Sequence, residues 1–295
     1  MIGAGPAGLS FATYAAQRGH EVTIFEASHQ IGGQFNIAKT IPGKEEFYET
    51  LRYFKRQIEL YPNIKLCLNQ TATYEQLKQA QFDEIVVATG VTPRHLEIEG
   101  IDHPKVLSYL EVLRDRITVG EKVAIIGAGG IGFDTAEYLT HSGESGSLNP
   151  EKFYDEWGID REYAQAGGIK AAAVETSPRQ VYLLQRKETP VGAGLGKTTG
   201  WIHRAGLKQR QVQMLSGVRY DKIDDQGLHI TVADKAMLLE VDQVVICAGQ
   251  VSNTAMFEQL QADGINVHLI GGAKQAGELD AKRAIRQGAE LAAVI

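Results

Sequence analysis

The chain has 295 residues, and at roughly 150 residues per domain this length predicts two domains. Hydrophobic residues make up 43% and charged residues 22%, so the chain can build proper cores and disorder is excluded. The formal net charge of −6 argues against a nucleic-acid-binding module, which usually carries a basic surplus. The 32 glycines show no collagen period and therefore indicate tight turns or close approach of the backbone to a ligand.

The cysteine count excludes several classes of site within this chain. Cys67 and Cys247 lie far apart and no CxxC pair exists, which excludes a disulfide scaffold, an iron–sulfur cluster, a zinc knuckle and a redox dithiol. The histidines show no metal-ligand spacing, so no metal site is expected. No long apolar run and no signal-peptide pattern occur, and we expect a soluble cytoplasmic protein without a membrane partner.

The N-terminus carries a glycine-rich loop in the context of a nucleotide-binding unit. The pattern G-x-G-x-x-G is formed by Gly3, Gly5 and Gly8, and a helical segment follows it. Residues 22–25 then form an expected strand that ends in Glu26. In such a unit the glycines let the pyrophosphate approach the helix N-terminus, and the acid accepts hydrogen bonds from the adenosine ribose. The segment therefore predicts a dinucleotide site.

A second loop of the same kind follows an expected buried strand at residues 122–126. Its glycines are Gly127, Gly129 and Gly132. The next expected strand, residues 180–185, ends in Arg186 and Lys187 instead of an acid. A cation at this place suits a 2′-phosphate, so the second site is interpreted as an NADPH site. The alternative is a solvated basic pair at a strand end.

Two further apolar strands end at Gly90 and at Gly249. We interpret them as crossovers in an α/β fold of two Rossmann-like three-layer dinucleotide-binding domains. The FAD-binding domain is expected to be discontinuous, comprising residues 1–114 and 251–295, with the NADP-binding domain inserted as residues 115–250. Because a first strand of about five residues is expected before the first loop, and only two residues precede it, we interpret the sequence as a fragment.

Residues 141–179 lengthen the second unit beyond the usual spacing of about 20 residues between glycine loop and second strand end. This insertion is rich in Gly, Ser and charged residues, with aromatic residues interleaved. It is expected to be a surface excursion that covers part of a neighbouring element.

The two-loop arrangement resembles the flavin-dependent pyridine-nucleotide oxidoreductases of the glutathione reductase type. More narrowly, residues 31–38, 42–47 and 194–203 resemble the C-terminal part of the bacterial NADPH-dependent 2,4-dienoyl-CoA reductase family. This resemblance covers essentially the whole sequence. It implies a longer protein, with an N-terminal TIM barrel that holds FMN, the catalytic acids and the dienoyl-CoA site, followed by cysteines that hold a 4Fe–4S centre.

The resemblance also assigns residues to cofactors. The FAD phosphates are expected on Gly3, Gly5, Ala7 and Gly8, and the ribose on Glu26. Further FAD contacts are expected from Gln34, Lys44, and Ala72 in a strand starting near Leu66. NADPH is expected on Gly127, Gly129, Gly132, Arg186 and Lys187, and the strand ends Gly90 and Gly249 complete the cofactor-binding set.

One departure from the wider superfamily concerns the flavin ribityl chain. The usual Gly-Asp is replaced by Gly271-Gly272-Ala273, so backbone amides or Asp280 are expected to substitute. The helix that begins near Asp280 is expected to direct its N-terminus at the flavin carbonyl edge, where it would stabilise charge on reduced flavin.

The function that these features favour is an electron-transfer module. Hydride passes from NADPH to FAD, and electrons leave to an acceptor in the absent N-terminal barrel, without a catalytic acid or base from this chain. A disulfide reductase of the thioredoxin reductase type needs a CxxC, which is absent. A stand-alone NADPH-dependent flavin reductase, a flavin monooxygenase and a non-catalytic nucleotide-binding docking module stay open. Cys247 is expected to be a small buried hydrophobe.

Overall fold

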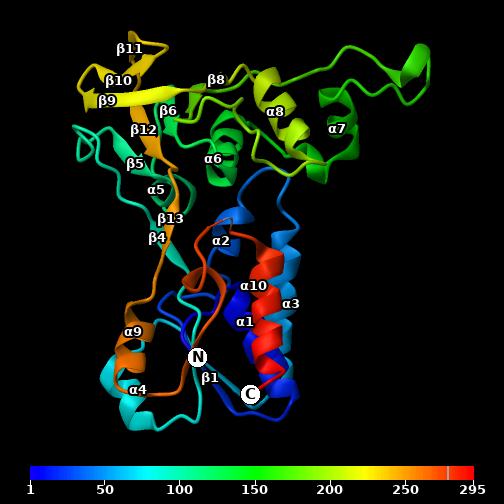
Figure 1. Ribbon diagram of the computed structural model, residues 1–295. Coiled ribbons are helices and arrows are strands. Elements are labelled where there is room, and N and C mark those ends of the chain that lie inside the picture. The colour runs from blue at the N-terminus through cyan, green and yellow to red at the C-terminus, as the bar shows by residue number, and fades with distance from the viewer. Residues whose placement is uncertain (278) are drawn as a thin grey trace. The chain divides into compact units, whose positions relative to one another are not determined.

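The computed structural model describes residues 1–277 and 279–295 and forms two compact units of a mixed α/β fold (Figure 1). The first unit comprises residues 1–38, 46–94 and 250–295. The second comprises residues 39–45 and 95–249. The α/β fold class expected from the sequence is thereby confirmed. No helix in the described part of the chain is both long enough and apolar enough to cross a membrane.

A parallel sheet forms the centre of the first unit. Its strands are β1 (Val22–Phe25), β2 (Ile64–Cys67), β3 (Ile85–Val87) and β14 (Val267–Leu269). β1 pairs with β2 and β3 pairs with β14, both in parallel. Ile2 forms parallel bridges to Phe25 and to Val87, so it joins the two pairs into one sheet immediately before the first glycine loop.

Helices cover both faces of this sheet. One core cluster joins it to α1 (Pro6–Gln17), α3 (Phe47–Leu60) and α10 (Ala281–Ala292), and another to α4 (Tyr74–Ala80) and α9 (Ala255–Ala262). In Figure 1, α1 and α10 lie side by side. Their close contact requires Gly288, because a Cβ there would come within 2.3 Å of the Ala7 carbonyl oxygen. The remaining elements are α2 (Phe35–Ala38), η3 (Gly271–Ala273), and the antiparallel pair β4 (Val91–Pro93) and β13 (Gln250–Ser252).

A five-stranded parallel sheet forms the centre of the second unit, in the order β5-β12-β6-β7-β8. The strands are β5 (Val106–Ser108), β6 (Lys122–Ile126), β7 (Gln180–Leu184), β8 (Gln213–Leu215) and β12 (Gln243–Ile246). The helix layer is formed by α5 (Tyr109–Leu113), α6 (Gly130–Thr140) and α8 (Gly200–Gln209).

The third layer of the second unit is a small antiparallel sheet of β9 (Val218–Asp224), β10 (Gly227–Val232) and β11 (Lys235–Leu239). Side chains of consecutive β7 residues point to opposite faces of the parallel sheet. One of these faces packs on the helix layer and the other on the small antiparallel sheet. Leu183 lies beneath Gly132 of α6, whereas Leu184 joins the core with the buried residues Leu228 and Ile230 of β10.

The border between the units differs from the expected residue 114. β5 pairs in parallel with β12, and α5 packs on both of these strands. Residues 95–114 therefore belong to the second unit, since their strand extends its sheet. The sequence did not show this pairing because β5 is a strand of only three residues.

The insertion at residues 141–179 contains η1 (Gly146–Leu148), α7 (Pro150–Glu156) and η2 (Ala166–Gly168). Two hydrogen bonds fasten it to the segment 39–45. The Gly43 amide donates to Ser145 Oγ at 3.2 Å, and the Ser147 hydroxyl donates to the Glu45 carboxylate at 2.6 Å. These bonds explain why residues 39–45 group with the second unit.

Candidate dinucleotide sites

Two of the three glycines in the first loop are required by the packing of the protein itself. Gly3 has a φ of +98°, and a Cβ there would lie 2.5 Å from the Ala88 carbonyl oxygen. A Cβ on Gly8 would lie 2.1 Å from the Gly3 carbonyl oxygen. Both positions therefore need glycine because the loop, the helix and the neighbouring strand end approach one another closely.

Gly5 is different, because the described part of the chain gives no internal reason for a glycine there. Its φ of −77° and ψ of −178° suit any residue, and a Cβ would meet no described atom within 4 Å. The open space lies at the N-terminus of α1, where the Ala7 and Gly8 amides of the first turn have no intrahelical acceptor. This open cradle at a positive helix end fits a pyrophosphate.

Glu26 is held in place to receive further hydrogen-bond donors. Its Oε2 accepts a hydrogen bond from the Ala4 amide at 2.7 Å, and its Oε1 accepts one from the Ser28 amide at 2.8 Å. A carboxylate has about four lone-pair directions, so these two bonds orient it and leave acceptor capacity. The geometry is compatible with the expected contact to ribose hydroxyls.

Gln34 and Gly90 lie in segments that the first unit brings toward its glycine loop. Gly33 packs against Gly5, where a Cβ would lie 3.1 Å from the Gly5 Cα, and Gln34 follows at the start of α2. Gly90, after β3, has a φ of +71° and lies near Gly272. Both segments therefore stand at the carboxyl ends of the sheet strands, where ligands of such folds bind.

The expected setting of Ala72 is wrong. β2 ends at Cys67, and Ala72 lies beyond it, immediately before the helix cap Thr73. The chain turns at Asn69, whose φ is +54°, and the Gln70 amide donates to the Glu26 carbonyl oxygen at 2.9 Å. Ala72 is buried in the core beneath this turn.

Asp280 has a structural role that the sequence did not show. Its Oδ1 accepts a hydrogen bond from the Lys282 amide at 2.9 Å and so caps the N-terminus of α10. In the nearby η3, the Gly271 amide donates to Gln287 of α10 at 2.8 Å, and Gly271 packs against Ala7. The Gly271-Gly272-Ala273 segment is therefore fixed between α1 and α10, and any contact with the ribityl chain stays a prediction.

The second loop repeats the geometry of the first. Gly127 has a φ of +110°, and a Cβ there would lie 2.6 Å from the Cys247 carbonyl oxygen, while one on Gly132 would lie 1.8 Å from the Gly127 carbonyl oxygen. Gly129, which precedes α6, would accept a Cβ without meeting any described atom within 4 Å. The second cradle is thus also open at a helix N-terminus and fits phosphate groups. Gly249, with a φ of +92°, lies three residues beyond Ile246, where β12 ends.

Arg186 and Lys187 are exposed immediately after β7, next to the strand that precedes the second loop. The turn that carries them is fixed from its backbone, because the Val218 amide donates to the Gln185 carbonyl oxygen and the Gly217 amide donates to that of Lys187. Burial raises the pKa of Tyr220, and the nearby Arg186 guanidinium opposes that rise. The structure thus offers two exposed cations on a fixed turn.

Lys44 lies in the second unit, where it forms a part-buried ion pair with Asp134. Its Nζ is 2.6 Å from Oδ1 and 2.7 Å from Oδ2 of that carboxylate. Asp134 follows the glycine loop on α6, so the pair stands beside the second cradle. Asp134 was not singled out from the sequence, although an acid two residues after the last glycine of the loop was a visible signal.

Cys247 is buried, and burial raises the pKa of its thiol to about 12. At pH 8 we therefore expect Ellman's reagent to leave Cys247 unmodified in the native chain, because only the thiolate reacts. The half-buried Cys67 is the remaining cysteine. A Cys247→Ser variant should give the same native thiol count as the parent chain, and a lower count would contradict this expectation.

Two open cradles at helix N-termini, in two parallel α/β units, define an oxidoreductase that binds two dinucleotides. Residues 1–275 match the family described as pyridine nucleotide-disulphide oxidoreductase. The chain belongs to this family, and it is a flavin-dependent NAD(P)H oxidoreductase module that binds FAD and NAD(P)H.

Relatives and solved structures agree with this assignment. The chain is 29% identical over 284 residues to a metal reductase of Desulforamulus reducens, covering 92% of this chain and 40% of the relative. It is 26% identical to a cinnamate reductase of Clostridium sporogenes, covering 93% and 36%. A 2-naphthoyl-CoA reductase in complex with 2-naphthoyl-CoA superposes with a TM-score of 0.81 at 29% identity, covering 100% of this chain and 39% of that one. The chain thus spans about two fifths of the length of these proteins.

Proposed function

We propose that this chain is the FAD- and NADPH-binding part of an NADPH-dependent 2,4-dienoyl-CoA reductase that serves unsaturated fatty acid β-oxidation in the cytoplasm. The first unit takes FAD and the second takes NADPH. The observation that carries this proposal is the pair of open cradles at Gly5 and Gly129, one followed by the acid Glu26 and the other by the cation Arg186. An acid suits a ribose hydroxyl, and a cation suits a 2′-phosphate.

The residues of this chain would bind and orient, and none needs to act as an acid or base. Bound FAD would supply an acceptor for the hydride of NADPH and a donor of single electrons. The amides of the two glycine loops hold the phosphates, Glu26 holds a ribose, and Arg186 with Lys187 holds the 2′-phosphate. Correct orientation then accounts for the rate.

The proposed acceptor lies outside this sequence. Electrons would pass to a 4Fe–4S centre and then to FMN in a barrel domain, where the dienoyl-CoA is reduced. Two observations support this arrangement: the segments 31–38, 42–47 and 194–203 resemble the 2,4-dienoyl-CoA reductase family, and a structural neighbour is named as a reductase of another CoA thioester. The neighbour supports an acyl-CoA as the class of final substrate.

The test joins this chain to the barrel and iron–sulfur portion of a bacterial 2,4-dienoyl-CoA reductase and measures dienoyl-CoA reduction by NADPH under anaerobic conditions. We expect the joined protein to reduce the dienoyl-CoA and the chain alone to reduce only a one-electron acceptor such as ferricyanide. A joined protein with bound FAD that reduces ferricyanide but no dienoyl-CoA would contradict the proposed acceptor. Rapid peroxide formation coupled to hydroxylation would instead favour a monooxygenase.

A further inference from the structure

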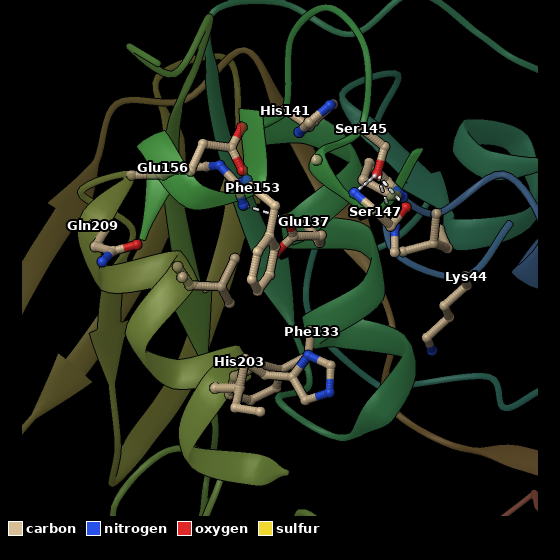
Figure 2. Close-up of a pocket in the computed structure, with 18 of the residues that line it drawn as sticks. Lys44, Phe133, Glu137, His141, Ser145, Ser147, Phe153, Glu156, His203 and Gln209 are labelled. Atoms are coloured by element: carbon tan, nitrogen blue, oxygen red, sulfur yellow. Dashed lines mark hydrogen bonds and ion pairs between the residues drawn. The ribbon is translucent and has the colours of Figure 1, made fainter. Parts of the chain in front are cut away.

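The second unit encloses a cavity of about 500 Å³ that the electron-transfer proposal does not use. Its walls come from α6, α7, α8 and the segment 39–45, so the insertion at residues 141–179 completes it. Figure 2 shows the ring of Phe153 extending from α7 toward α6 and α8, with His203 at the opposite side. The insertion is therefore more than the surface excursion expected from the sequence, because it builds one wall of a cavity.

The far end of this cavity is separate from the second glycine loop. The Lys44–Asp134 pair lines the end near the loop, whereas His141 lines the other end. His141 is the C-terminal cap of α6, a helix that begins at Gly130. Seven positions along α6 separate Asp134 from His141, so at 1.5 Å per residue these two ends lie about 10 Å apart along the helix axis.

Three helix C-termini converge on the far end. α6 ends before His141, α7 ends before Trp157, and α8 ends before Arg210, and all three of these capping residues line the cavity. The C-terminus of a helix carries a partial negative charge from its unpaired carbonyl groups. The backbone alone therefore favours a cation in this part of the cavity.

The side-chain charges add to this preference. Glu137 is paired with Arg210, and Glu175 lies 2.8 Å from Lys152, whose ammonium holds the pKa of that carboxyl below its usual range. The negative charge of Glu156 is less fully compensated, because its Oε1 atom is 3.9 Å from the same Lys152 nitrogen. Its side chain is only 14% exposed. A largely buried carboxylate with one distant partner favours a cationic ligand.

Two further features indicate which other chemical groups the cationic ligand has. The Nε2 atom of His141 is buried and has no hydrogen-bond partner among the described residues, so in the neutral ring it can accept from a ligand N–H. Phe153 and Trp157 lie with ring centroids 6.2 Å apart, and both line the cavity. Aromatic faces attract cations and aromatic rings alike.

We propose that the far end of this cavity is a binding site for a small aromatic ammonium compound, with its N–H groups directed to Glu156 and His141 and its ring against Phe153 and Trp157. This site goes beyond the proposed electron-transfer function. Anionic ligands such as nucleotides or acyl-CoA phosphates are disfavoured there, because the carboxylates and the helix C-termini would repel them.

The test is isothermal titration calorimetry of the FAD-loaded chain with phenethylamine and, as a probe of similar size and opposite charge, 3-phenylpropionate. We expect phenethylamine to bind and 3-phenylpropionate to bind at least about tenfold more weakly, since a charged hydrogen bond accounts for a factor of this order. Glu156→Gln should weaken phenethylamine binding by a similar factor. The matched control Glu151→Gln, on the same helix but exposed and paired with Arg161, should leave binding unchanged.

A second measurement keeps the proposal testable if Glu156→Gln disturbs α7. Saturating NADPH should leave the affinity for phenethylamine unchanged, because the two sites are separate, and Trp157→Ala should weaken it. Equal binding of the two probes, binding that NADPH abolishes, or an affinity unaffected by both Glu156→Gln and Trp157→Ala would overturn the proposal. So would the absence of any phenethylamine binding.

Discussion

Replacing Gly5 with valine is expected to abolish FAD retention while the chain stays folded. A side chain at this position would enter the open cradle at the N-terminus of α1, where the pyrophosphate is proposed to bind, and its Cβ would meet no described atom within 4 Å. The backbone at Gly5 suits a β-branched residue, so the fold itself should not be strained. The purified variant should be colourless, with a circular dichroism spectrum like that of the parent chain.

The matched control is Gly129→Val in the second loop, which has the same geometry. This variant should stay yellow and lose NADPH binding. The two variants thus assign one cofactor to each loop. A folded Gly5→Val protein that keeps its full flavin content would show that the first cradle is not the FAD site.

The second large effect is expected from Arg186→Ala. Loss of the guanidinium removes charge-assisted hydrogen bonds to the 2′-phosphate, which contribute about 1.5–3 kcal/mol. The affinity for NADPH should therefore fall roughly 10- to 100-fold, since each 1.4 kcal/mol is about tenfold. NADH has no 2′-phosphate, and its affinity should change little. Dissociation constants for both nucleotides, from equilibrium titration of the variant, check this expectation.

Arg114→Ala is the control, because Arg114 is also exposed in the second unit but is paired with Asp115. It should leave both affinities unchanged. Equal losses for NADPH and NADH in Arg186→Ala would mean that this cation has only a general role, and no loss for either would mean that it is a solvated surface residue. In both cases the assignment of Arg186 to the 2′-phosphate would be wrong.

The fold could be predicted from the sequence wherever a long local pattern was present. The glycine loops, with their flanking strands and helices, fix a strand–loop–helix unit through short-range sterics, and the structure contains both units. The short strand β5 could not be assigned in this way. Its membership of the second sheet depends on pairing with β12, far along the chain, and three residues carry too little pattern to show it.

The candidate site shows the same division between local and long-range features. Gly5 and Gly129 could be identified from spacing, and their open surroundings agree with that interpretation. The partner of Lys44 could not be identified from the sequence, because Asp134 is distant along the chain and only the fold brings the two residues together. The role of the insertion was equally hidden, since only the folded chain brings Glu156, Trp157 and His141 to the lining of one cavity.

The most direct test of the central claim is an anaerobic titration of the purified chain with NADPH and, separately, with NADH, while the visible absorption band of the flavin is followed. We expect a yellow protein that NADPH bleaches at a much lower concentration than NADH does. A yellow protein that neither nucleotide bleaches would contradict the proposal that the second loop delivers hydride to the flavin.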